Sequence, residues 1–351
     1  MRRFRIAFAI VLLAIAGMVP AMDKAASANT PAGLEVAKAD RRTPDQTFLT
    51  FPEWFLVFSP AEYADALHAN TGPSAFPFFG HIGQFWNAYA QVIRATRPYP
   101  FNGEYHTMIV VIGTSTTVEY GLKGVYETLI GRLSELTAPA NSTPEDRLAT
   151  EQAQAYVDFI RVRPWYEFDF VTPLKHLWTQ TPYWGAHPLR KWERRYLLTS
   201  EWLVKAGYAA LLGKATHSAF EIPKVTTATI VENLPENTGT DLPDLKRLQQ
   251  DGAQTLVTLP RYQAFTDYAL ALSKQGTRFV DIAGNRGAIL VSVVVPSAEP
   301  SSAIDRVLIR QPIVTRPGFE RRVLQVDVAR LSEVLRTHAA AGNVIEHIFD
   351  Y

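Results

Sequence analysis

The sequence of 351 residues contains no cysteine. This absence excludes disulfide bonds, thiol nucleophiles, thiolate-bound iron–sulfur clusters and cysteine-based zinc sites. It also excludes the lipid-modified cysteine of a bacterial lipoprotein. In an oxidising compartment, the stability of such a chain has to come from packing alone.

An excess of charge of one sign is lacking too. The 35 Lys+Arg stand against 34 Asp+Glu, which gives a formal net charge of +1. This balance offers no overall field that attracts nucleic acid, so we predict no nucleic-acid partner. Removal of residues 1–21 would delete three arginines and no acid, and would leave a net charge of −2.

Common catalytic and ligand-binding motifs are missing as well. The chain has no Gly-x-Ser-x-Gly or Ser-x-x-Lys nucleophile motif, no His-Glu-x-x-His zinc motif and no glycine-rich phosphate loop leading into a helix. The eight histidines fall into no ligand pattern. We therefore predict no cofactor and no resident metal, and the sequence favours a role without catalysis.

The N-terminus has the pattern of an export signal. Three arginines within the first five residues precede an uncharged run from Ile6 to Met22. The run is shorter than a typical spanning helix of roughly 20 residues, although it could cross a thin bilayer. We predict that residues 1–21 form a signal peptide or an N-terminal membrane anchor, and that residues 22–47 form a flexible spacer. The protein then belongs to the cell envelope, either periplasmic or secreted after cleavage, or anchored by this helix.

The composition divides the rest of the chain into two parts. Residues 48–216 carry all seven tryptophans and repeat apolar positions every three or four residues, which predicts a helical, aromatic-rich domain. Residues 222–351 contain β-branched runs with helical patterns between them, which predicts an α+β domain. The fold class is thus a two-part α+β protein. The order of the C-terminal elements suggests a ferredoxin-like βαββαβ plan with an inserted hairpin.

Two segments of the helical part align without a gap, residues 117–131 and residues 199–213. This alignment suggests an internal repeat. Six positions are identical, namely Thr117/Thr199, Glu119/Glu201, Lys123/Lys205, Tyr126/Tyr208, Leu129/Leu211 and Gly131/Gly213.

The Glu, Lys and Tyr of each copy lie at i, i+4 and i+7, along one face of a helix. Three hypotheses follow. The charges are structural ion pairs within a buried helix; or two carboxylates face a shared cleft for acid–base or metal chemistry; or the segments near 107–125 and 196–213 cross a membrane. The candidate catalytic residues of the second hypothesis are Glu119, Glu201, Lys123, Lys205, Tyr126 and Tyr208.

Two further features carry charge or a titratable group. His81 lies on an aromatic helical pattern, where a core or capping role is favoured over metal ligation, and it is the remaining weak catalytic candidate. Residues 190–195 hold four bases and one acid. We interpret this cluster as a solvated helix start, with contact to lipid headgroups as the alternative.

The function that these patterns favour is binding or scaffolding at the membrane face of the cell envelope. The partner is the membrane surface or another envelope component, and the aromatic-rich helical domain also suits an apolar small-molecule ligand. The alternatives are an enzyme that uses Glu119 and Glu201, with or without a divalent metal, and an integral membrane protein.

Overall fold

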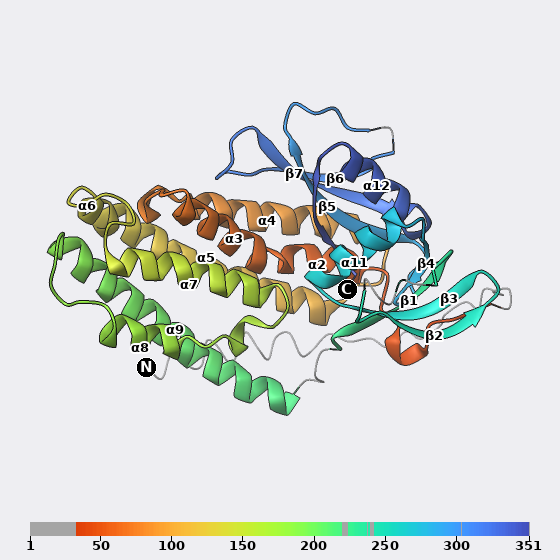
Figure 1. Cartoon of the computed structure of the whole chain (residues 1–351), viewed down its shortest axis with the longest axis horizontal. Coiled ribbons are helices and arrows are strands. Elements are labelled where there is room, and N and C mark those ends of the chain that lie inside the picture. The colour runs from red at the N-terminus through yellow and green to blue at the C-terminus, as the bar shows by residue number, and fades with distance from the viewer. Residues whose placement is uncertain (1–32, 220–223, 237, 239–241, 303, 351) are drawn as a thin grey trace. The chain divides into compact units, whose positions relative to one another are not determined.

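The computed structural model describes residues 33–219, 224–236, 238, 242–302 and 304–350, so the predicted signal peptide or anchor lies outside the described residues. A helical region comes first, and a region with two four-stranded antiparallel sheets follows it (Figure 1). The predicted two-part α+β fold class is therefore confirmed.

The helical region is built mainly from long helices, with short turns of other helical types between them. Its α-helices are α2 (Gln46–Glu53), α3 (Phe55–His68), α4 (Phe78–Ala95), α5 (Gly103–Tyr126), α6 (Arg132–Glu135), α7 (Pro144–Ile160), α8 (Val171–Thr179) and α9 (Pro188–Ala219). The 3-10 helices are η1 (Lys38–Asp40), η2 (Pro73–Ala75) and η4 (Trp165–Glu167), and the π-helix η3 (Glu127–Gly131) joins α5 to α6.

Local sequence explains several of these boundaries. Thr143 caps α7 through a capping box with Asp146, and Pro144 occupies the first turn, where its missing N–H costs nothing. The π-helix η3 ends at Gly131. A Cβ at this position would collide with the carboxylate of Glu127. Helices α5, η3 and α6 thus form one continuous helical path with one widened turn.

The helical region has a twofold internal pattern. The order α3, η2, α4 and α5 recurs as α7, η4, α8 and α9. Helix α3 packs against α7. Ion pairs join Lys123 of α5 to Glu201 of α9, and Glu119 of α5 to Lys205 of α9, so the two long helices run antiparallel.

The second region also consists of two similar halves. The first half contains β1 (Thr226–Glu232), β2 (Lys246–Asp251), β3 (Gln254–Pro260), α11 (Gln263–Lys274) and β4 (Arg278–Ile282). The second half contains β5 (Ala288–Pro296), β6 (Val307–Pro312), β7 (Phe319–Asp327), the 3-10 helix η5 (Val328–Arg330), α12 (Leu331–Ala340) and β8 (Val344–Ile348). The strand orders are β2-β3-β1-β4 and β6-β7-β5-β8, which is the same topology.

The irregularities of the two sheets match as well. The pairing of β2 with β3 skips Leu248, and the pairing of β6 with β7 skips Leu308. The register of β1 against β4 shifts after Ile230, and that of β5 against β8 shifts after Ser292. Each sheet therefore carries the same two bulges, which set its local twist.

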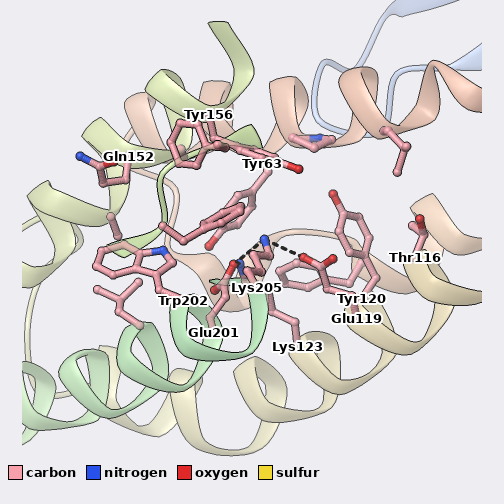
Figure 2. A pocket seen from close by; sticks show the side chains of 18 of the residues that line it. Tyr63, Thr116, Glu119, Tyr120, Lys123, Gln152, Tyr156, Glu201, Trp202 and Lys205 are labelled. Atoms are coloured by element: carbon pink, nitrogen blue, oxygen red, sulfur yellow. Dashed lines mark hydrogen bonds and ion pairs between the residues drawn. The ribbon is translucent and has the colours of Figure 1, made fainter. Parts of the chain in front are cut away.

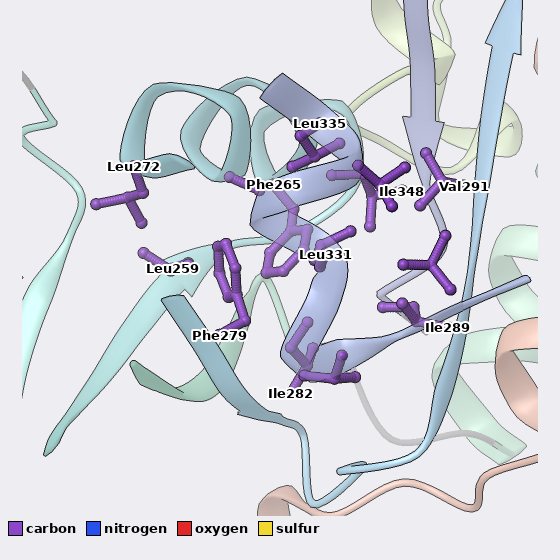
Figure 3. Packing of buried hydrophobic residues seen from close by; sticks show 14 of the residues in the cluster. Leu259, Phe265, Leu272, Phe279, Ile282, Ile289, Val291, Leu331, Leu335 and Ile348 are labelled. Atoms are coloured by element: carbon purple, nitrogen blue, oxygen red, sulfur yellow. The ribbon is translucent and has the colours of Figure 1, made fainter. Parts of the chain in front are cut away.

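Helices α11 and α12 lie between the two sheets, and their apolar faces form the main core of this region (Figure 3). Phe265 of α11 and Leu331 of α12 are fully buried there. The hydroxyl of Thr266 accepts a hydrogen bond from the backbone N–H of Ile348, at 2.9 Å. In the other direction, Ser332 donates to the carbonyl of Thr277, at 2.7 Å. Each helix is thus bound to the opposite half.

The ferredoxin-like plan was wrong. The strands divide between two sheets, each with a βββαβ order, instead of forming one βαββαβ sheet. The helical pattern at residues 242–251 predicted a helix, which was also wrong, because Lys246–Asp251 form strand β2. The physical reason is that strand order depends on pairing between distant segments, which local patterning does not report.

The predicted flexible spacer was wrong for its second half. Leu34 and Val36 are buried against Ala228 and Ile230 of β1. The side chain of Arg286 donates to the carbonyl of Leu34, at 3.0 Å. These contacts fix residues 34–41 on the sheet, and only residues 22–32 of the spacer lie outside the described residues.

The helical and sheet regions share a second core. Phe48, Phe51 and Phe55 pack with Val323 and Phe349 in one buried cluster. The hydroxyl of Thr47 donates to the carbonyl of Phe349 and accepts from the N–H of Leu290, both at 3.0 Å. Residues 34–351 accordingly form one compact unit.

The alternative hypothesis placed membrane spans near residues 107–125 and 196–213. These segments belong to α5 and α9, and none of the helices within the described ranges is both long enough and apolar enough to cross a membrane.

Candidate functional site

A cavity of about 100 Å³ lies where the two halves of the helical region meet. Side chains from α3, α4, α5, α7 and α9 surround it (Figure 2). Many of its lining residues form equivalent pairs from the two halves. These pairs are Leu56 and Ala149, Pro60 and Ala153, Tyr63 and Tyr156, Phe78 and Phe170, Glu119 and Glu201, Tyr120 and Trp202, and Lys123 and Lys205.

Two lysines and two glutamates form a chain of ion pairs beside the cavity (Figure 2). Lys123 Nζ lies 3.2 and 3.0 Å from the two carboxylate oxygens of Glu201. Lys205 Nζ lies 3.0 Å from Glu201 Oε1 and 2.9 Å from Glu119 Oε1. The Lys–Glu pairs between helices are reciprocal, since each copy of the repeat supplies a lysine to the glutamate of the other copy.

The aromatic surroundings of the two lysines are also matched. Lys123 Nζ lies 4.4 Å from the ring centre of Tyr63 and 5.9 Å from that of Phe78. Lys205 Nζ lies 5.3 Å from the ring centre of Tyr156 and 5.9 Å from that of Phe170. These cation–π contacts stabilise a charge that is largely removed from water.

The matched geometry extends beyond the cavity. The rings of Tyr63 and Phe76 meet edge to face at 4.9 Å and 77°, and those of Tyr156 and Phe168 do so at 5.2 Å and 81°. The indole N–H of Trp86 donates to Thr117 at 2.9 Å, and that of Trp178 donates to Thr199 at 3.0 Å.

The sequence repeat is therefore part of a larger correspondence that sequence reasoning missed. The signal that could have found it is a Phe-x-Phe pair followed by Trp, at Phe76, Phe78 and Trp86 and again at Phe168, Phe170 and Trp178. The offset between these copies is 92 residues, whereas the offset between Thr117 and Thr199 is 82. Because the connections differ in length, a gapless comparison detects only the last segment.

The ionisation of the cluster does not suit acid–base chemistry near neutral pH. Burial works to raise the pKa of Glu201, but Lys123 and Lys205 outweigh it and hold the pKa below the ordinary value of 4.5. Burial likewise works to lower the pKa of Lys205, but its glutamate partners hold the pKa well above 10.5. Both groups stay fully ionised around pH 7, so neither is poised to exchange a proton.

Glu119 and Glu201 are not arranged as a pair of metal ligands. Glu119 and Glu201 line the same cavity, as the cleft hypothesis required, yet Lys205 occupies the position between them. Across the described ranges, no group of three or more His, Asp or Glu side chains is arranged to hold a metal ion.

The remaining predicted site residues lie away from the cavity. Tyr126 stacks on Tyr196 and Tyr208 lies against Trp165, with ring centres 6.4 and 5.4 Å apart. His81 is 2% exposed and lies in the aromatic core beside Phe76, at 4.7 Å.

Ser59, His81 and Glu62 line up in the order of a hydrolase triad. Ser59 Oγ lies 2.9 Å from His81 Nδ1, and His81 Nε2 lies 3.5 Å from Glu62 Oε2. All three residues are buried. Neither Ser59 nor His81 lines the cavity, or the smaller pocket that shares Tyr63 and Glu201 with it. Burial lowers the pKa of His81 to about 4. His81 is thus a neutral core residue that hydrogen-bonds Ser59, whereas Glu62 is paired with Arg321.

The basic cluster at residues 190–195 is buried, so its interpretation as a solvated helix start was wrong. Arg190 bonds Asp146 at 2.8 Å, and Arg194 bonds Glu127 at 2.8 Å. Glu145 forms ion pairs with both Lys191 and Arg195. The acidic partners come from η3 and α7, far away in the sequence, so the local pattern could not reveal them.

A second feature is the outer surface of α5, η3, α6 and α9, which we call the α5–α9 face. Its large apolar side chains are 39–79% exposed. Along α5, η3, α6 and the residue that follows, they are Val111, Val118, Leu122, Val125, Leu129, Leu133 and Leu136; on α9 they are Trp192, Tyr196, Leu203, Val204 and Leu211.

Helix α9 is inverted relative to an ordinary surface helix. From Pro188 to Gly213, every charged residue is buried or partly buried, while the exposed positions are apolar or small. On residues 107–130, Glu119 is the one exposed charge. Charged side chains of soluble proteins normally face water, and an exposed apolar face of this kind is typical of interaction surfaces.

Comparisons with family models, curated proteins and solved structures find no match to this chain. The function must therefore be argued from the cavity and the α5–α9 face.

Proposed function

We propose that this protein is a cell-envelope binding or scaffolding protein that docks on a lipid bilayer through the α5–α9 face. The observation that carries the proposal is the inverted polarity of α5 and α9. Over residues 107–130 and 188–213 the charged side chains are paired, and Glu119 is the one exposed member. A stripe of Val and Leu at spacings of three and four residues is exposed from Val118 to Leu136, with the exposed Arg132 beside it. Charged groups that pair inside, with apolar groups outside, are the arrangement that a hydrocarbon environment requires.

Aromatic residues at one end of this face support a bilayer as the occupant. Trp184 is 77% exposed, and Tyr183, Trp192 and Tyr196 are also exposed around the start of α9. Tryptophan and tyrosine favour the boundary between headgroups and hydrocarbon, because one edge of each ring is apolar and the other is polar. This aromatic cluster would fix the depth of the start of α9.

The N-terminal sequence supplies a second membrane signal. The uncharged run from Ile6 to Met22 suits insertion, and residues 23–33 connect it to the first buried residue, Leu34. Eleven residues reach at most about 40 Å when extended. If the run stays in the bilayer, this short connection tethers the rest of the chain to the membrane and raises the effective concentration of the α5–α9 face there.

The absence of cysteine provides a direct test with the full-length chain. A polarity-sensitive fluorophore on Leu122→Cys reports on the face, and the same label on Leu248→Cys reports on β2, where Leu248 is 58% exposed. We expect lipid vesicles to shift the emission of the label at 122 to the blue and to leave the label at 248 unchanged. Leu129→Glu should reduce the shift at 122, because it places a charge about two turns further along the face.

Two outcomes would contradict the proposal. If vesicles shift the emission of the label at 122 no more than that of the label at 248, the α5–α9 face stays in water. A blue-shifted label at 122 that depends on protein concentration and not on vesicles would mean that a second copy of the chain covers the face.

A further inference from the structure

We infer that the cavity between the two halves of the helical region binds the polar head of a small uncharged molecule, an alcohol or carbonyl compound with an apolar body. Three features carry this inference. They are hydroxyl groups without protein partners, a charge cluster that is already neutral, and aromatic walls.

The hydroxyl groups come first. Tyr120 is 7% exposed and lines the cavity, yet no hydrogen bond to its hydroxyl group comes from any residue within the described ranges. The same holds, within those ranges, for the hydroxyl groups of Tyr63 and Tyr156, which line the cavity from α3 and α7 (Figure 2). A tyrosine hydroxyl can both donate and accept a hydrogen bond, so these three groups at the cavity wall are open to hydrogen bonds with an occupant.

The lysines add donors at the same place. Lys123 directs two contacts at Glu201, and Lys205 directs one at Glu119 and one at Glu201. An ammonium group has three N–H donors, so each lysine retains one beyond these contacts. A site with this many donors favours an acceptor, such as the oxygen of a hydroxyl or carbonyl group.

The charge of the site selects against ions. Lys123 and Lys205 are balanced by Glu119 and Glu201, so no uncompensated charge remains for an anion or a cation. An ion would lose its hydration without gaining an opposite charge. An uncharged occupant avoids this penalty.

The walls and the size set the shape of the occupant. The rings of Phe78, Phe170 and Trp202 supply apolar surface on several sides. A cavity of about 100 Å³ is smaller than the roughly 150 Å³ that accommodates benzene in a closed protein core. Half-exposed Glu119 lies at its edge, so the cavity is not sealed. The ligand therefore enters head first and leaves part of its apolar body in the opening.

The test uses three probes of similar size that differ in charge at pH 7, namely phenol, benzoate and benzylammonium. Their affinities for the full-length chain are measured by ligand-observed NMR titration. We expect phenol to bind more tightly than either ion. Tyr120→Phe should weaken phenol binding about fivefold, because it removes one neutral hydrogen bond and no volume.

Tyr63→Phe and Tyr156→Phe should each weaken binding by a similar factor, since the two residues occupy equivalent positions. The matched control is Tyr126→Phe on the same helix as Tyr120, which should leave the affinity unchanged because Tyr126 lies against Tyr196 outside the cavity. Tighter binding of either ion would overturn the inference. So would an unchanged affinity in Tyr120→Phe, or no binding of phenol at all, which would leave water as the occupant.

Discussion

Replacement of Glu201 by glutamine is expected to lower the free energy of unfolding by about 3–5 kcal/mol. The carboxylate of Glu201 binds both Lys123 and Lys205, and the variant leaves these two ammonium groups buried with too little opposite charge. Breaking a buried pair by removing one partner is strongly destabilising, because an uncompensated charge stays behind. Denaturant unfolding of the wild-type and variant chains measures the difference.

The matched control is Glu119→Gln at the equivalent position of the repeat. The side chain of Glu119 is 44% exposed, against 16% for Glu201, so water screens its pair with Lys205. We expect a loss of about 1 kcal/mol or less. Equal losses in the two variants would show that burial does not set the strength of these pairs.

The effect of Glu201→Gln should also depend on pH in a defined direction. The pKa of Glu201 is lowered by its lysine partners, so its contribution is fully present at pH values above the ordinary value of 4.5. The contribution declines as pH falls further, because the carboxylate becomes protonated in the unfolded chain first and in the folded chain later. The difference between wild type and variant should therefore shrink in acid.

Replacement of Arg321 by methionine is expected to lower the free energy of unfolding by about 3–5 kcal/mol. The variant loses the ion pairs that connect the sheet to α3 of the helical region. Arg321 of β7 is 2% exposed and donates to Glu62 of α3 at 3.2 Å and to Glu346 of β8 at 2.6 Å. Its guanidinium group lies 4.0 Å from the ring centre of Phe58. Methionine fills part of the volume but leaves two carboxylates without their cation.

The loss in Arg321→Met should be smaller at pH 5 than at pH 8. Burial already raises the pKa of Glu62 in the wild-type chain, while Arg321 opposes that rise. Without Arg321 the pKa of Glu62 rises further, and protonation then removes the buried charge. Arg310→Met on β6 is the control, since Arg310 is 48% exposed and its pair with Glu320 contributes little. A loss in Arg321→Met that is the same at both pH values would contradict this explanation.

The parts of the fold that depend on local patterns could be predicted from the sequence. The apolar spacing over residues 77–95 and 188–214 predicts α4 and α9, and the β-branched runs at 288–295 and 322–328 predict β5 and β7. Both patterns depend on the burial of a single element, which its own sequence reports. The arrangement of strands into two sheets could not be predicted, because it depends on pairings such as Val231 with Thr255 and Val291 with Leu324.

The candidate site was predictable in part. The recurrence of Glu, Lys and Tyr identified Glu119, Glu201, Lys123 and Lys205, which the fold brings together, but it also selected Tyr126 and Tyr208, which lie elsewhere.

The tyrosines that line the cavity escaped notice because they come from different helices. The burial of the bases at residues 190–195 was equally hidden. Glu145 accepts Lys191 at 2.9 Å and Arg195 at 2.6 Å, and it lies 46 residues before the nearer of them.

The central claim is that the α5–α9 face contacts lipid. It is tested most directly by spin labels placed singly at Val118, Leu122 and Val125 of the full-length chain in vesicles, with Leu248 as the control. The measurement compares collisions of each label with oxygen, which concentrates in lipid, and with a nickel chelate, which stays in water. The account predicts that oxygen collisions dominate at 118, 122 and 125, and that the chelate dominates at 248. Dominance of the chelate at all four positions would contradict it.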